Sequence, residues 1–307
     1  MNRVSTSGNY STILTNLISA QQRQADAGRQ VSTGKNGTNL KDYAHNAEML
    51  TAMNTIDARI TSHLEQNKAI SAKLETQDFA LSQISDAAGK TRQAIADALA
   101  TDRADTLMQE LSSQFANVVG GLNSAYGGKY LFAGGQIDTP PMSATKLSDL
   151  TAPLTVISDF FHNDTLVTQA KVDDSTTVTT GALADQMSTN LMSAFKTMQA
   201  FHEATPFGGQ LTPAQRTFLE TQLAAWVPIH ESSVNDTARN GIVRARVEGV
   251  KADLDNRQIS IAGLIGDVAD ADMAKAATNL TQAQQAVQAA SQVFINLRDT
   301  SLLNFLR

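Results

Sequence analysis

The positions of proline constrain the fold of this chain more than any other feature. All six prolines of the 307-residue sequence fall within one central window, so that residues 1–139 and 229–307 contain none. A proline inside a helix costs roughly 3 kcal/mol, because it lacks an amide donor and clashes with the preceding turn. Both ends of the chain are therefore free to form long helices. The helix breaks lie between them, at Pro140, Pro141, Pro153, Pro206, Pro213 and Pro228.

The C-terminal stretch carries a seven-residue repeat of apolar side chains. A stripe with a period of 3.5 residues is typical of a coiled-coil seam, which is narrower than the apolar face of an ordinary globular helix. A seam at a chain terminus needs a partner: the N-terminal helix, a neighbouring subunit, or both. This pattern indicates assembly rather than catalysis. Its residues are Met273, Ala276, Leu280, Ala283, Val287, Ala290, Phe294 and Leu297.

The first predicted helix, over residues 10–31, offers a shorter apolar stripe that gives way to glutamines after Ile18. A short stripe facing a longer seam would form only a marginal pair in isolation. We therefore expect the terminal helices to fold on assembly with other subunits. The residues expected at the assembly interface are Tyr10, Ile13, Leu14, Leu17, Met273, Leu280, Val287, Phe294 and Leu297.

Long helices are also predicted between the two ends. A helix break is expected at Gly34 and Asn36–Gly37, followed by a helix from about Asp42, a candidate N-cap, to about Ala100. Further helices are expected over 107–122 and 183–204, from Pro213, and from Asn240. The stripe of the 42–100 helix falls at multiples of seven residues, at Met53, Ile60, Leu74, Leu81, Ala88 and Ile95.

A small insertion separates these helices. Short runs rich in Val and Thr at 154–157 and 176–179 predict strands. Gly127–Gly128 and Gly134–Gly135 precede the insertion and suggest a hinge. The fold class is therefore mainly α: a long antiparallel helical bundle or coiled coil, with the terminal helices paired and a small β-containing insertion domain.

The predicted segments are nested within one another. Residues 1–38 and 268–307 are expected to form a terminal helical assembly domain, and residues 39–136 and 183–267 a central helical domain. Residues 137–182 form the outer β-containing insertion domain. In a nested chain the two termini lie together at one end.

Composition excludes several classes of function. The net charge is −6 and no block of Lys or Arg occurs, so a nucleic-acid-binding protein is not expected. Cysteine is absent, which excludes disulfides and thiolate chemistry. The first residues lack the apolar core of a signal peptide, and no run of about 18 apolar residues is long enough to span a membrane. Any export is therefore expected to use another route.

No catalytic, cofactor or metal site is predicted. The five histidines, which include His45 and His230, show no zinc-site spacing, and no nucleophile elbow or phosphate-binding loop occurs. An enzyme on a helical scaffold would need a polar site that the sequence does not reveal. Asp267, Asp270 and Asp272 could suggest calcium, but the loop lacks the other ligand positions. A helix-breaking, N-capping acidic link is the better interpretation.

Short motifs at both ends resemble the bacterial flagellin-type axial family. They are the opening Arg3–Ser7, the turn Val31–Lys35, the acidic link Asp267–Asp272 and the ending Ser301–Leu306. Tyr130–Gly135, with the Thr139–Pro141 segment, is more similar to hook–filament junction proteins, the third hook-associated proteins, than to filament flagellins. The resemblance spans about 1–140 and 240–307 and leaves the insertion unmatched.

The resemblance implies a structural, non-enzymatic role in the bacterial flagellum. It implies an adapter that joins the hook, through a preceding hook-associated ring, to the flagellin filament; the alternative is a filament-forming flagellin. The implied partners are another hook-associated protein, flagellin, further copies of the chain in a ring, the flagellar type III export apparatus and an export chaperone. The implied location is the extracellular flagellum, with no cofactor, nucleic acid or membrane partner.

Overall fold

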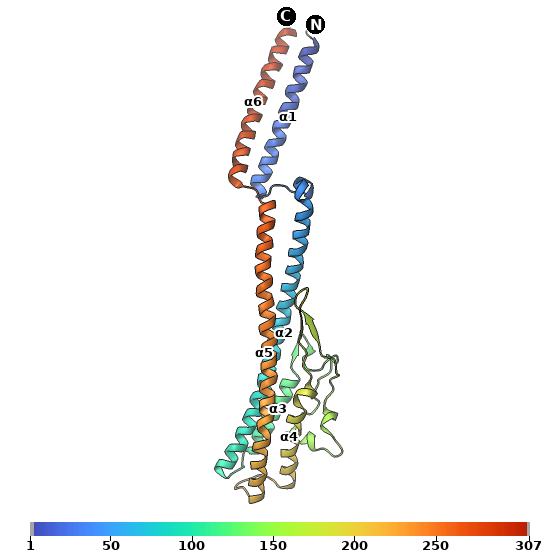
Figure 1. Cartoon of the computed structure of the whole chain (residues 1–307), viewed down its shortest axis with the longest axis vertical. Helices are drawn as coiled ribbons and strands as arrows, with labels where there is room; N and C mark the ends of the chain where they lie inside the picture. Colours follow the sequence, from blue (N-terminus) through green and yellow to red (C-terminus); the bar gives the residue numbers. More distant parts are fainter. Residues whose placement is uncertain (1–2, 306–307) are drawn as a thin grey trace. The chain divides into compact units, whose positions relative to one another are not determined.

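The protein is mainly α-helical, with a small β-containing region, as the sequence predicts (Figure 1). The structure is a computed structural model that describes the backbone of residues 3–305 and the side chains of residues 11–296. The chain forms two compact units, one of residues 1–61 and 256–307 and the other of residues 62–255. The helices are α1 (Arg3–Thr33), α2 (Ala47–Thr101), α3 (Leu107–Leu122), α4 (Ala184–Ala204), α5 (Pro213–Ala269) and α6 (Met273–Phe305).

The first unit is built on an antiparallel pair of α1 and α6, which brings the chain ends together (Figure 1). Helix α1 ends as predicted at Gly34, whose φ is +67°, a left-handed conformation that favours glycine. Its N–H donates to the carbonyl of Gln30 at 2.9 Å. A 3₁₀-helix, η1 (Leu40–Asn46), then leads into α2.

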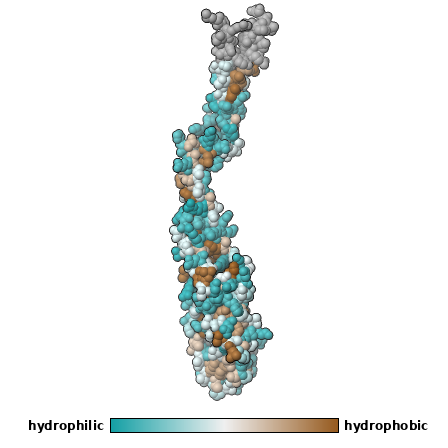
Figure 2. All heavy atoms as spheres, turned by 90° about the vertical axis from the view of Figure 1, so that its right-hand side faces the viewer, coloured by the Kyte–Doolittle hydropathy of each residue, from teal (hydrophilic) through white to brown (hydrophobic). Residues whose placement is uncertain are grey.

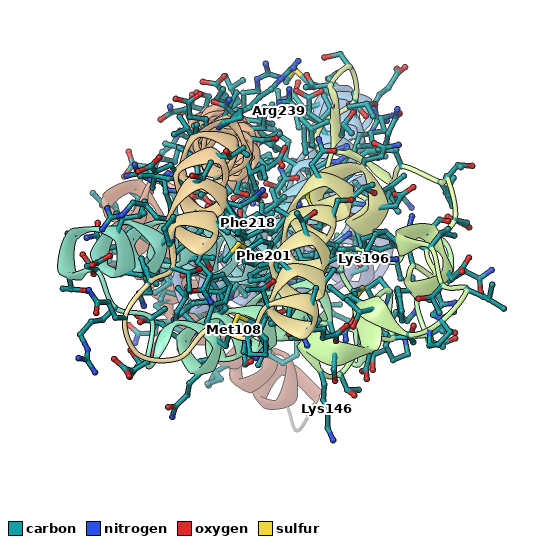
Figure 3. The ribbon with its side chains drawn as sticks, turned by 90° about the horizontal axis from the view of Figure 1, so that it is seen from below. Met108, Lys146, Lys196, Phe201, Phe218 and Arg239 are labelled. Carbon is teal, nitrogen blue, oxygen red and sulfur yellow. The ribbon has the colours of Figure 1, made fainter. Side chains whose placement is uncertain are left out.

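The second unit has a helical core formed by α2, α3, α4 and α5. Trp226, Phe115 and Phe195 are its largest fully buried side chains. The Phe195 ring lies edge-on to both others, with centroids 5.5 Å from Phe115 and 5.0 Å from Trp226. Half-buried Phe201 and Phe218 stack at 3.7 Å between α4 and α5 (Figure 3).

Helix α5 is longer than the sequence predicts. A separate helix was expected to begin at Asn240, but α5 runs unbroken from Pro213 to Ala269 and includes Pro228. Every seventh side chain along it is buried, so packing along one face outweighs the local cost of the proline and glycine. The buried residues are Leu219, Trp226, Ser233, Asn240, Val247 and Leu254.

The insertion contains two short hairpins and two 3₁₀-helices. Strands β1 (Ala125–Tyr126) and β2 (Lys129–Tyr130) pair around Gly127–Gly128, so this glycine pair forms a hairpin turn, with φ of +59° and +78°. Strands β3 (Gln169–Lys171) and β4 (Thr177–Thr179) also pair antiparallel. The 3₁₀-helices are η2 (Leu147–Thr151) and η3 (Ile157–Phe160).

Only one of the two predicted strand segments is a strand. The 176–179 run forms β4, whereas the 154–157 run forms a turn that leads into η3. Leu154 is fully exposed and has a φ of +65°, and the Thr155 amide donates to the carbonyl of Ala152. Pro153 precedes Leu154 in this turn, and the proline ring favours a turn over a strand.

The β3–β4 hairpin is fastened to the helices beneath it. Val172 and Val178 pack against Leu74 of α2 and Val247 of α5. Asn67, fully buried on α2, donates from Nδ2 to the carbonyl of Val172 at 2.8 Å. The insertion is thus attached through apolar contacts and a polar residue in the helix stripe.

Gly121 gives a test of the contact between α3 and α2. A Cβ at Gly121 would lie 2.7 Å from Ile84 Cγ1 and 3.0 Å from the Ala80 carbonyl, whereas one at Gly120 would meet only Gln83 Nε2 at 3.4 Å. Gly121→Ala should lower the free energy of unfolding by about 1–3 kcal/mol, because α3 must move away from α2.

The matched control is Gly120→Ala, which should be neutral or stabilising by up to about 1 kcal/mol, because alanine favours helix. Urea unfolding followed by circular dichroism measures both changes. Equal effects of the two variants would show that α3 does not approach α2 this closely.

Candidate assembly interface

Helices α1 and α6 face each other along two matching seams. On each helix the buried and half-buried side chains follow four- and three-residue steps, the spacing of a coiled coil. The α6 seam predicted from the sequence is confirmed from Ala276 to Phe294. The α6 positions are Ala276, Leu280, Ala283, Val287, Ala290 and Phe294, and the α1 positions are Ile13, Leu17, Ala20, Gln24, Ala27 and Val31.

The α1 seam extends further than the sequence reading assigned it. Ala20 and Ala27 are buried and Val31 is half-buried, beyond the point where the large apolar side chains end. These residues were missed because alanines do not stand out in an alanine- and glutamine-rich stretch. Continuing the heptad spacing from Ile13 and Leu17 would have found them.

The centre of the pair is small and polar. Ala27 and Ala283 line a shallow hollow between α1 and α6, together with Arg23, Asp26, Gln30, Asn279, Gln282 and Ala286. The fully buried seam residues are alanines, while the larger Leu280, Val287 and Phe294 are only half-buried. Hydrophobic stabilisation scales with the apolar area buried, so this pair alone gains little.

Some large apolar side chains lie outside the seam. Leu14 is 39% exposed and Met273, at the start of α6, is 47% exposed, so these two predicted residues do not pack between α1 and α6. Ile18, Val293 and Ile295 are exposed as well. Figure 2 shows hydrophobic side chains gathered near this end of the chain. The side chains of Tyr10 and Leu297 lie outside the described residues.

The two links that bound the helix pair are hydrogen-bonded to each other. The Ala271 amide donates to the Gly34 carbonyl at 2.9 Å, and the Asn36 amide donates to the Ala269 carbonyl at 2.8 Å. Lys35 and Asp270 form an ion pair across the same link. Asp272 caps α6, accepting from the Ala274 and Lys275 amides at 2.9 and 3.1 Å. The acidic link thus ends one helix and starts the next, as predicted.

Asp42 caps the loop before α2 rather than α2 itself. Its carboxylate accepts hydrogen bonds from the backbone amides of Asn39 and Thr38, at 3.0 and 2.9 Å. These bonds hold the pKa of the Asp42 carboxyl below its usual value. The predicted N-cap residue is therefore a cap, but of the 3₁₀-helix η1.

The described residues show neither a metal cluster nor a membrane span. Within residues 3–305 no three potential metal-ligating side chains gather. Of the predicted calcium candidates, Asp270 is paired with Lys35 and Asp272 is engaged as a cap. No helix in the same part of the chain is long and apolar enough to cross a bilayer.

The comparisons point to flagellar proteins. Residues 233–306 match the family model for the bacterial flagellin C-terminal helical region. The fold is similar to that of a protein from Vibrio parahaemolyticus assigned as a flagellar hook-associated protein, with 13% identity, a TM-score of 0.61 and coverage of 75% of this chain and 100% of that one. It is also similar to Bacillus cereus FlgL, with 14% identity, a TM-score of 0.53 and coverage of 71% and 99%. Comparison with curated proteins gives no match.

Val287 tests the seam directly. Val287→Asp places a charge in the half-buried layer between α1 and α6 and should weaken their pairing by about 1–3 kcal/mol. Ala289→Asp is the matched control, because Ala289 lies two residues away and is exposed. Amide hydrogen exchange over residues 273–296 should accelerate in the first variant only. Equal protection in both would exclude the seam as the source of the pairing.

Asp272 tests the acidic link. Asp272→Ala removes the cap of α6 and should cost about 1 kcal/mol of helix stability, whereas Asp267→Ala removes an exposed carboxylate that caps no helix. Thermal unfolding followed by circular dichroism compares them. An equal loss in both variants would mean that the capping bonds do not stabilise α6.

Proposed function

We propose that this protein is a structural, non-enzymatic component of the bacterial flagellum. The observation that carries the proposal is the seam-matched pair of the first and last helices, because the matched flagellin C-terminal region includes nearly all of α6. An axial flagellar protein needs helical ends that pack against copies of themselves and against neighbours. Helices α1 and α6 carry large apolar side chains that the pair leaves partly exposed.

Within that role, we propose an adapter that joins the hook to the filament. Its terminal helices would stack on a preceding hook-associated ring on one side and receive flagellin on the other, with copies of the chain side by side in a ring. The fold similarity to two hook-associated structures supports this role over that of a filament flagellin. The exposed Leu14, Ile18, Val293 and Ile295 offer surface for such neighbours.

The parts of the chain would divide the work. We assign assembly to residues 1–38 and 268–307, axial packing to residues 39–136 and 183–267, and the outer surface to residues 137–182. The proposed location outside the cell requires export, for which we propose the flagellar type III apparatus with an export chaperone. A terminal pair that is marginal alone suits this route, because it would fold fully only on assembly.

Seeded growth distinguishes a junction protein from a filament flagellin. The purified chain is mixed with sheared filaments, and filament length is measured by electron microscopy. A junction protein needs only a short ring, so the chain should bind filament ends without extending them. A flagellin would elongate, because each subunit templates the next. Long homopolymeric growth would replace the junction role with that of a filament protein.

A deletion strain tests the role in the cell. Cells without the gene should keep an intact hook and release polymerisable flagellin into the medium. Normal filaments on the deletion strain would contradict any essential role at the junction.

A further inference from the structure

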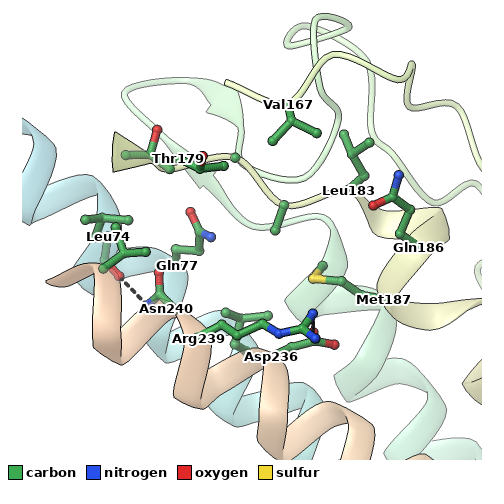
Figure 4. A pocket seen from close by; sticks show the side chains of 15 residues that line it. Leu74, Gln77, Val167, Thr179, Leu183, Gln186, Met187, Asp236, Arg239 and Asn240 are labelled. Carbon is green, nitrogen blue, oxygen red and sulfur yellow. Dashed lines mark hydrogen bonds and ion pairs between the residues drawn. The ribbon is translucent and has the colours of Figure 1, made fainter. Parts of the chain in front are cut away.

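A hollow of about 340 Å³ lies in the second unit, between α2, α5 and the segment that follows β4 (Figure 4). Most of its wall is apolar. Leu74 and Leu81 come from α2, Val243 from α5, and Leu183 and Met187 from the start of α4 and the residue before it. A void of this size is far larger than the roughly 15 Å³ that one water needs.

Two buried amide oxygens face this hollow without a donor. Gln77 and Asn240 are only 4% and 5% exposed, and neither Gln77 Oε1 nor Asn240 Oδ1 accepts a hydrogen bond from the described protein groups. The Asn240 nitrogen is already engaged, because it donates to the Leu74 carbonyl at 3.0 Å and to Asp78 at 3.1 Å. In Figure 4 the Gln77 side chain extends from α2 towards the segment around Thr179. A buried acceptor without a donor is costly, so both oxygens favour a donor group.

A carboxylate lies on the same face of α5. Asp236 precedes Asn240 by four residues, which places both on one side of the helix and in the wall of the hollow. Burial raises the pKa of the Asp236 carboxyl, which the nearby Arg239 lowers in part. The Arg239 guanidinium lies 3.6 Å away but is 80% exposed, so solvent weakens this pair. Arg239 is the other charged side chain of the wall.

We propose that this hollow binds a primary ammonium group carried on a short apolar chain. An ammonium has three donors and no acceptor, which matches Gln77 Oε1, Asn240 Oδ1 and the Asp236 carboxylate. Its alkyl stem would pack against Leu183 and Met187. A carboxylate ligand would instead meet the like charge of Asp236. The group belongs either to a free alkylamine or to a lysine side chain of another protein, and the proposal is independent of the flagellar role.

Calorimetric titration with n-butylammonium tests the proposal, with n-butanol as the uncharged matched probe. The ammonium should bind saturably, and the alcohol at least about tenfold more weakly, because a charged hydrogen bond is lost. Asp236→Asn should weaken ammonium binding by at least about tenfold, and Gln77→Met by a few fold. Asp253→Asn, which removes an exposed carboxylate of α5 outside the hollow, should leave the affinity unchanged.

A third probe, N-acetyl-lysine amide, separates the two sources. Binding as tight as that of n-butylammonium supports a lysine side chain of another protein, while binding of n-butylammonium alone supports a free amine. The proposal is overturned if neither ammonium probe saturates, or if Asp236→Asn and Gln77→Met bind normally while circular dichroism shows them folded.

The unmodified chain supplies a test that does not depend on the variants. The ammonium requires the ionised Asp236 carboxylate, whose pKa lies above its usual value. Affinity should therefore fall as the pH is lowered through this raised pKa. An affinity that does not change with pH over the range in which the protein stays folded would also overturn the proposal.

Discussion

The pairing of long helices along seven-residue seams is the interaction on which the rest of this structure depends. In the second unit, α5 buries one side chain every two turns, from Leu219 to Leu254, and α2 does the same from Ile60 to Ile95. Each layer adds buried apolar area, so the contribution of a single layer is modest while that of the whole seam is large. This explains how α5 continues through Pro228 and Asn240–Gly241, where local preferences alone predict breaks.

Polar residues within these seams give the layers different roles. Asn67 occupies a position seven residues from Ile60 and from Leu74, yet it is fully buried and holds the β3–β4 hairpin through the Val172 carbonyl. Asn240 bonds to the Leu74 carbonyl and to Asp78, which Arg244 also contacts at 2.7 Å. An apolar residue at either position would keep the layer but lose these bonds. The polar layers therefore fix where the hairpin and the two helices meet, at some cost in hydrophobic burial.

The terminal pair follows the same geometry with weaker materials. Its fully buried members are alanines, its larger side chains remain half-buried, and polar groups line its centre. A seam of this kind can hold two helices together while leaving apolar surface for further partners. The proposed role in a ring depends on this difference between a filled seam in the second unit and a partly filled one in the first.

The sequence by itself determined the helix pattern, because periodicity and proline placement are local properties. It predicted the mainly α class, the α6 seam from Ala276 to Phe294, the end of α1 at Gly34 and the acidic cap at Asp272. Tertiary structure decided the features that depend on contacts distant in sequence. These are the continuity of α5, the turn at Leu154 in place of a strand, the bonds between the two links, and the hollow between Gln77 and Asp236. No local pattern encodes them, since their stabilising partners lie up to 235 residues away, as for Lys35 and Asp270.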